Sequence, residues 1–92
     1  RRSLHTVETL KHYRSQAEKT RASELEKAMR QLQRGDEPEQ VLQQFSRALT
    51  NKLIHRPSVS LKKAGSEGRL EVVSWMRELF GLDHRHDKNE EL

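Results

Sequence analysis

The stretch that decides the fold is Ala48–Ala64, ALTNKLIHRPSVSLKKA, in the middle of the chain. Its first half has apolar residues at helical spacing, so it predicts the end of a helix that turns Leu49 and Leu53 inward. Pro57 disfavours the α conformation of Arg56, the residue before it. The sequence therefore predicts a helix that stops at residue 54 or 55 and turns a corner at the proline.

Beyond the proline, the sequence predicts two shorter helical segments. Ser58 or Ser60 can cap a short helix around residues 59–64 that Gly65 closes, and GSEG at 65–68 predicts a turn. A last helix follows over residues 69–80 and ends at Gly81.

Before the quoted stretch, the sequence predicts one long helix and the start of a second. Ser3 can cap a helix that runs from Leu4 to Arg34, with Gly35 directly after its end. GDEPEQ at 35–40 then places acids and a proline where a new helix starts. No strand-like alternation occurs, so the predicted fold class is all-α, a long N-terminal helix plus a small helical bundle completed by homodimerisation.

The first helix has apolar residues at both ends and a polar middle. Leu4, Val7 and Leu10 begin its apolar side, and Leu25, Ala28, Met29 and Leu32 resume it, with charged residues in between. This pattern predicts a long connecting helix that packs against one folded part of the protein at its start and against another at its end. It does not favour a regular coiled coil.

Two features predict how the later helices meet their surroundings. Lys52 lies in the middle of the apolar arc of the second helix, where it either snorkels into solvent or pairs with a carboxylate; the sequence favours snorkelling. The last helix is apolar over more than half of its circumference. This width predicts that the helix packs against its own chain on one side and against a partner on the other.

Composition indicates one small domain with little core of its own. The chain has 92 residues, of which 32% are hydrophobic and 35% charged, whereas typical values are about 45–50%, counted with glycine, and 25%. A domain of this size and polarity buries little surface alone, so oligomerisation is a natural supplement. The chain opens with RRS, which we interpret as a start inside a longer protein. We expect that protein to be cytoplasmic. Residues 1–82 are the predicted domain, and 83–92 a polar disordered tail.

The sequence contains no pattern that supports catalysis or a resident metal. There is no cysteine, and the five histidines show no pair at i, i+4 spacing. His84 and His86 alternate in the tail, where solvated side chains explain them better than a metal site. No glycine-rich phosphate loop follows a strand, and we assign no catalytic, cofactor-binding or metal-binding residue.

The net charge of +4 is unevenly distributed. Residues 1–34 hold nine Lys or Arg and four Glu, whereas residues 55–65 hold three Lys or Arg and no acid. Lys52, Arg56, Lys62 and Lys63 could contact the phosphates of a tRNA. From the pattern alone, a solvated basic face is the favoured interpretation.

Three segments together resemble a known family. They are HYRSQAEKTRASELEKA at 12–28, LTNKLIHRPSVSLKKA at 49–64 and LEVVSWMRELFGL at 70–82. The resemblance, over residues 5–82, is to the C-terminal dimerisation domain of bacterial glutamyl-tRNA reductase, and LTNKLIH-x-P is its most specific part. It implies an oxidoreductase that uses NADPH to reduce the glutamyl group on tRNA(Glu) to glutamate-1-semialdehyde, at the start of tetrapyrrole (porphyrin) biosynthesis. It also implies a V-shaped homodimer whose catalytic and NADPH-binding domains lie upstream, so this segment alone should be inactive.

With this resemblance, we expect the quoted stretch to form a corner of a homodimer interface, in which Asn51 sets the geometry of the turn. The predicted interface residues are Leu49, Thr50, Leu53, Ile54, Val72, Val73, Trp75, Met76, Leu79 and Phe80. Two alternatives stay open: a basic helical module that contacts tRNA, and a stand-alone adaptor that binds a helix of another protein.

Overall fold

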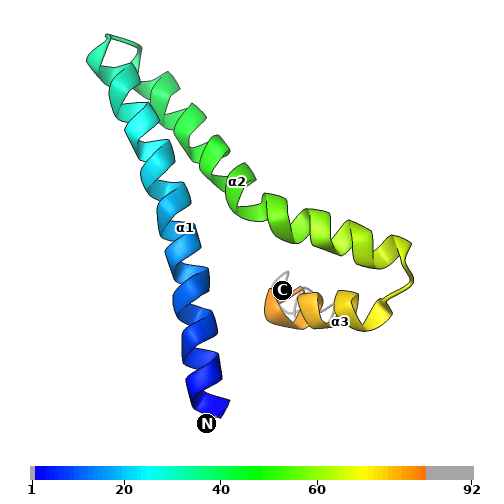
Figure 1. Ribbon diagram of the computed structural model, residues 1–92. Helices are drawn as coiled ribbons and strands as arrows, with labels where there is room; N and C mark the ends of the chain where they lie inside the picture. The colour runs from blue at the N-terminus through cyan, green and yellow to red at the C-terminus, as the bar shows by residue number, and fades with distance from the viewer. Residues whose placement is uncertain (1, 83–92) are drawn as a thin grey trace, which may run out of the picture. The chain divides into compact units, whose positions relative to one another are not determined.

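Three α-helices make up the part of the chain that the structure describes, residues 2–82 with side chains from residue 4 onward. In this computed structural model, α1 spans Arg2–Gln33, α2 spans Pro38–Ser66 and α3 spans Leu70–Leu79 (Figure 1). No strand occurs within residues 2–82, and the all-α prediction is confirmed. The chain divides into two compact units, residues 1–54 and residues 55–92, which are described separately below. The predicted tail at 83–92 lies outside the described residues.

All three helices end in the same way, at a glycine with positive φ. Gly35, Gly68 and Gly81 have φ angles of 95°, 74° and 65°. After α1, the N–H of Asp36 donates to the carbonyl of Gln31, and the N–H of Gly35 to that of Leu32. The same pair of bonds follows α2 and α3. This is the Schellman arrangement, which satisfies carbonyls at a helix end and which a residue with a Cβ adopts only with strain.

The prediction that the chain turns at Pro57 is wrong. α2 passes through Pro57 without interruption and ends at Ser66, so the separate helix at 59–64 is part of α2, and Gly68, not Gly65, follows its end. A proline within a helix has no N–H for the carbonyl four residues earlier, here that of Leu53. The preference of the preceding residue for an extended conformation is a bias that helical neighbours on both sides override. No turn therefore exists for Asn51 to position.

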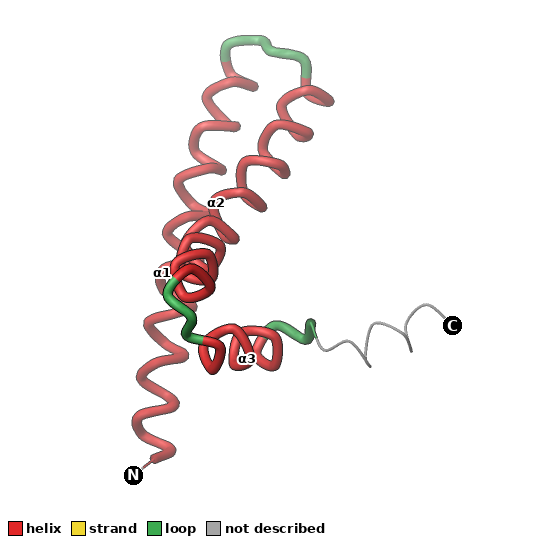
Figure 2. The backbone as a smooth tube through the Cα atoms, turned by 90° about the vertical axis from the view of Figure 1, so that its right-hand side faces the viewer, coloured by secondary structure: helices red, strands yellow, loops and turns green. Residues whose placement is uncertain are grey.

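The first unit is a helical hairpin formed by α1 and the first part of α2. A short connection at 34–37 reverses the chain, and the two helices lie side by side near it (Figures 1 and 2). Ala28 on α1 and Val41 on α2 are buried at this contact. In the connection, Arg34 Nε lies 3.1 Å from both carboxylate oxygens of Asp36. This hydrogen bond, and then the charge of Asp36, raises the pKa of Arg34.

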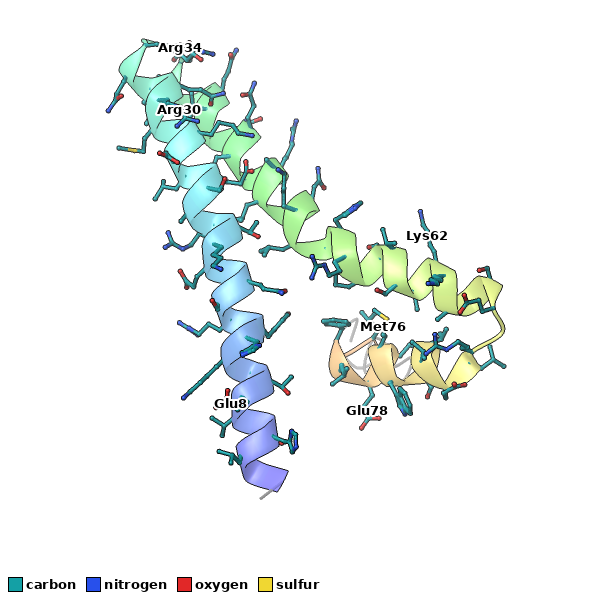
Figure 3. All side chains as sticks on the ribbon, in the orientation of Figure 1. Glu8, Arg30, Arg34, Lys62, Met76 and Glu78 are labelled. Carbon is teal, nitrogen blue, oxygen red and sulfur yellow. The ribbon has the colours of Figure 1, made fainter. Side chains whose placement is uncertain are left out.

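The second unit pairs the last part of α2 with α3. Ala64 is its buried residue on α2, and Leu61 is half-buried one turn earlier. On α3, Val72, Val73 and Met76 are half-buried, and Met76 points from α3 toward α2 while Glu78 points away (Figure 3). A small side chain such as that of Ala64 lets two packed helices approach closely.

The remaining helix boundaries agree with the predictions within about two residues. α1 begins at Arg2, so Ser3 lies inside the helix and is not its cap. α3 spans residues 70–79 where 69–80 were predicted, and Phe80 is its C-cap. Differences of this size are usual at helix ends, because the last turn frays and its hydrogen bonds are few.

Candidate functional site

The first unit contains a buried carboxylate that connects its two helices. Glu24 on α1 is 3% exposed, and its Oε2 lies 3.3 Å from Nζ of Lys52 on α2. Its Oε1 lies 3.6 Å from Nζ of Lys27, one turn along α1. A buried carboxylate is costly unless it is paired, and here two ammonium groups share its charge.

This arrangement corrects the interpretation of Lys52. The favoured prediction was that Lys52 snorkels into solvent, but its ammonium group pairs with Glu24, which was the alternative. The Lys52 side chain is still 58% exposed, so its stem covers the edge of the helix contact while its end reaches the carboxylate. Sequence reasoning missed Glu24. The available signal was its position between Ala17 and Ala28 on the contact side of α1, opposite a lysine in the apolar arc of the next helix.

Four of the predicted interface residues lie on α2 in the first unit. Leu49 is half-buried, whereas Leu53 and Ile54 are 43% and 52% exposed and Thr50 is exposed. Thr50 lines a shallow open depression with Ser46, Arg47 and Asn51, all of them on α2. Leu49 is therefore partly covered within its own unit and Leu53 is largely open in a single chain, and their place in a dimer interface stays a prediction.

The other six predicted interface residues lie on α3 or at its end. Val72, Val73 and Met76 are half-buried in their own unit, whereas Trp75, Leu79 and Phe80 are 59%, 76% and 45% exposed. The helix thus has one covered and one open apolar side, and the partner expected on the open side stays a prediction. Within the second unit, these six residues lie together on α3 and at its C-terminal end.

Apolar residues outside the predicted set are equally exposed. Leu25, Met29 and Leu32 on α1 and Leu42 on α2 are between 37% and 63% exposed. Among the described residues, Ala28, Val41 and Ala64 are the buried apolar ones, against sixteen large apolar side chains left exposed. A single chain that leaves so much of its apolar surface open is incomplete as a folded domain.

The basic residues differ from one another in their surroundings. Arg56, Lys62 and Lys63 are exposed on the last part of α2, and Lys62 points away from α3 (Figure 3). Within residues 4–82, none of these three forms a side-chain ion pair, in contrast to Lys52.

Neither a metal site nor a membrane span is found in the described part of the chain. No group of three or more His, Asp or Glu side chains is arranged to hold a metal ion there. Of the three helices, none combines the length and the apolar character that crossing a bilayer requires.

Comparison with known proteins identifies the family. The model of the family "Glutamyl-tRNAGlu reductase, dimerisation domain" matches residues 1–82. A glutamyl-tRNA reductase of Hahella chejuensis is 48% identical over 89 residues, which are 97% of this chain and 21% of that protein. Those of Pseudomonas entomophila and Pseudomonas aeruginosa are 53% and 50% identical over 88% and 89% of the chain, and 19% of each protein.

The match covers most of this chain but a small part of each relative. The chain spans about a fifth of the length of these reductases, and no solved structure matches it. With the family model matching residues 1–82 and relatives near 50% identity, the chain belongs to the family of glutamyl-tRNA reductase dimerisation domains.

Proposed function

We propose that this chain forms a homodimer and thereby joins two copies of a longer reductase. The observation that carries the proposal is the imbalance between three buried apolar residues and sixteen exposed large ones in the described part of the chain. A second copy is the partner that the family name supports. Contacts between identical chains in closed dimers are isologous, so the same surface serves both copies.

The test of homodimerisation is sedimentation equilibrium of the 92-residue chain over a wide range of concentration, with helicity measured in parallel. We expect a dimer that dissociates on dilution with partial loss of helicity, because folding and association are then linked. A stable, fully helical monomer at every concentration would overturn the proposal.

For the interface itself, the proposal takes over the ten residues predicted from the sequence. Leu53→Asp places a charge on the exposed apolar surface of α2, and Val73→Asp places one on the half-buried apolar surface of α3. Each variant is expected to give a poorly folded monomer. If both variants remained dimeric, that assignment would be wrong, although another surface could still form the dimer.

For the parent enzyme, we propose NADPH-dependent reduction of glutamyl-tRNA(Glu) to glutamate-1-semialdehyde, in the cytoplasm, at the start of tetrapyrrole biosynthesis. The support is that the relatives are named glutamyl-tRNA reductase. In this proposal, NADPH binds and the catalytic residues lie in regions of the enzyme outside this chain. We expect no oxidation of NADPH by the 92-residue chain with glutamyl-tRNA, and activity once the upstream domains are joined to it.

A second proposed role is contact with tRNA through the basic residues of α2. It is favoured by the exposure of Arg56, Lys62 and Lys63, which form no side-chain ion pair within residues 4–82. Lys52 is a weaker candidate because its ammonium group is held by Glu24. The alternative is that these charges are simply solvated.

The test neutralises the three free side chains together as Arg56→Gln, Lys62→Gln and Lys63→Gln. If each contacts a phosphate, tRNA affinity falls and the slope of log affinity against log salt decreases by about one per contact, with dimerisation retained. The control neutralises Lys11, Arg14 and Lys19, which are exposed on α1. An equal loss in both triple variants would mean that only net charge matters, which contradicts a specific contact.

A further inference from the structure

Among the described residues, Glu24 is the one charged side chain that is buried. It lies in the contact between α1 and α2 that also buries Ala28 and Val41. Of the ion pairs within residues 4–82, the pair of Glu24 with Lys52 is the one that joins two helices. A buried ion pair contributes little net stability, because the lost hydration of both charges offsets their attraction. This pair therefore points to a role other than stability.

The rest of the contact does not define one register of the two helices. Its alanines, such as Ala28 on α1 and Ala48 on α2, are alike in size and form no directional contact. A slide of one helical turn moves one helix by about 5.4 Å along the other. Such a slide separates Lys52 from Glu24, which is then buried with Lys27 as its remaining partner. The slide is therefore unfavourable for the ion pair, whereas the alanines meet similar neighbours in both registers.

The two ends of the hairpin are held by different means. The connection at 34–37 holds both helices covalently at one end. Glu24 lies nine residues before the end of α1 at Gln33, which is about 14 Å along the helix. Lys52 lies two residues before the end of the first unit at residue 54. The connection thus sets the register in its own neighbourhood, and the ion pair lies at the opposite, open end.

We propose that Glu24 and Lys52 form a clasp that fixes the register of the hairpin and closes its open end, without adding to its stability. A single buried polar residue specifies register in coiled coils at a cost in stability. A buried ion pair acts in the same way here, because any other register leaves a buried charge without its partner. The clasp belongs to the first unit and does not depend on the proposed homodimerisation.

The register also determines which exposed side chains are neighbours on the surface of the hairpin. The residues after Glu24 and Lys52 are Leu25 and Leu53. One residue is a rotation of about 100° around a helix, and in antiparallel right-handed helices the same rotation from the contact leads to the same side. Leu25 and Leu53 therefore share one side of the hairpin. Met29 and Leu49, which follow the alanines of the contact, lie on this side too. By fixing the register, the clasp keeps these four side chains aligned.

The test replaces both charges with apolar side chains of similar length, as Glu24→Met combined with Lys52→Met in the 92-residue chain. The matched control is Glu26→Met combined with Arg30→Met. It removes an exposed pair within α1, in which Glu26 Oε2 lies 3.6 Å from a guanidinium nitrogen of Arg30. Both double variants lose one ion pair, but the clasp is lost in the first one alone.

The register is measured with pairs of spin labels and pulsed electron paramagnetic resonance. The natural chain has no cysteine, so introduced cysteines carry the labels. Ala22→Cys with Thr50→Cys labels the open end, and Gln33→Cys with Gln43→Cys labels the end near the connection. All four positions are exposed, and each lies two residues from a contact residue, a rotation of about 200°. An excess of unlabelled chain of the same variant restricts the measured distances to labels within one chain.

We expect the variant without the clasp to be as stable as the natural chain or more so. Its equilibrium constant for unfolding should stay within about tenfold of the natural value or fall below it. At the open end, the distribution of distances should broaden about twofold or split, because the apolar contact permits sliding. Near the connection, and at both ends in the control variant, the distributions should keep their natural width.

Exchanging the charges, as Glu24→Lys combined with Lys52→Glu, tests whether the pairing itself fixes the register. The exchange restores the attraction between the helices, so the narrow distribution at the open end should return. Its stability should fall below that of the natural chain, because the ammonium group of Lys27 then faces a like charge one turn away.

Three outcomes would overturn the inference. If the variant without the clasp keeps the natural distribution at the open end, other contacts fix the register. Broadening at both ends, or a rise of more than about tenfold in its unfolding constant, means that the pair stabilises the hairpin as a whole. A broad distribution in the charge-exchanged variant means that the shape of the two side chains, and not their pairing, sets the register.

Discussion

The two units of the chain are both pairs of helices, but they are held together by different means. The first unit has a long contact with Ala28 and Val41 buried and a carboxylate paired between its helices. The second buries a single alanine, Ala64, against a helix of ten residues. Isolated helices shorter than about 12–15 residues are marginal in water. The first unit thus has internal contacts that specify its hairpin, whereas α3 depends more on what packs against it.

The strongest test of this difference between the units is a charged substitution at the most buried position of the first unit. Val41 is 2% exposed, and Val41→Asp is expected to lower the free energy of unfolding by about 3–5 kcal/mol, because it buries an unpaired carboxylate. Denaturant unfolding followed by circular dichroism measures the change at one fixed chain concentration.

The matched control for that variant is Val59→Asp in the second unit. Val59 is 51% exposed, so its replacement should change the free energy of unfolding by less than about 1 kcal/mol. Similar losses in both variants would mean that Val59 is buried in the assembled protein, and the contrast between the units would then not hold.

A change at the boundary between the units tests the continuous helix. Pro57→Ala supplies an N–H for the carbonyl of Leu53 and removes a residue that is unfavourable inside helices, so stability should rise by about 1–3 kcal/mol. Arg56→Ala at the neighbouring exposed position should change it by less than about 0.5 kcal/mol. A loss of stability in Pro57→Ala would favour the turn that the sequence predicted.

The paired carboxylate gives a smaller expected effect. Glu24→Gln keeps the shape of the side chain but removes the charge that faces Lys27 and Lys52, and we expect a loss of about 1–2 kcal/mol in thermal or chemical unfolding. Glu26→Gln is the control because Glu26 is 73% exposed and pairs with Arg30 at 3.6 Å, an exposed pair worth less than about 0.5 kcal/mol. Equal losses in the two variants would show that the burial of Glu24 adds nothing to the contribution of its ion pairs to the free energy of unfolding.

Two glycines at the end of α2 provide the smallest effects, with opposite signs. Gly68 has φ of +74°, so Gly68→Ala should cost about 1 kcal/mol. Gly65 lies inside α2 with open space around the site of a Cβ, and Gly65→Ala should stabilise by about 0.5–1 kcal/mol. Losses in both would indicate that Gly65 is closely approached in the assembly.

The sequence predicted the features of the fold that depend on a few neighbouring residues. Gly35 and Gly81 follow the helices that they were expected to end, because a glycine after an apolar helical pattern accommodates the left-handed conformation there. Pro57 misled the prediction because its local bias was weaker than the helical tendency on both sides. The local signals thus identified the ends of helices better than their interruptions.

The candidate site was less predictable than the fold because it depends on which residues face each other across the hairpin. Periodicity along α2 indicated Leu49 and Leu53, but it could not show that Leu25 and Met29 of α1 share their side. That requires the register of the two helices, to which the contact of Glu24 with Lys52 adds a long-range restraint. Pairings between distant residues are not encoded in local pattern.

The missing N–H of Pro57 has a consequence for how the protein opens. The boundary between the units falls at residues 54 and 55, next to the helical turn in which the carbonyl of Leu53 lacks its usual donor. Cooperativity along a helix depends on an unbroken ladder of hydrogen bonds, so the two halves of α2 should act as separate units of local unfolding. In native-state hydrogen exchange, amides of residues 39–53 are then expected to share one opening free energy with α1, and those of residues 58–66 a lower one with α3.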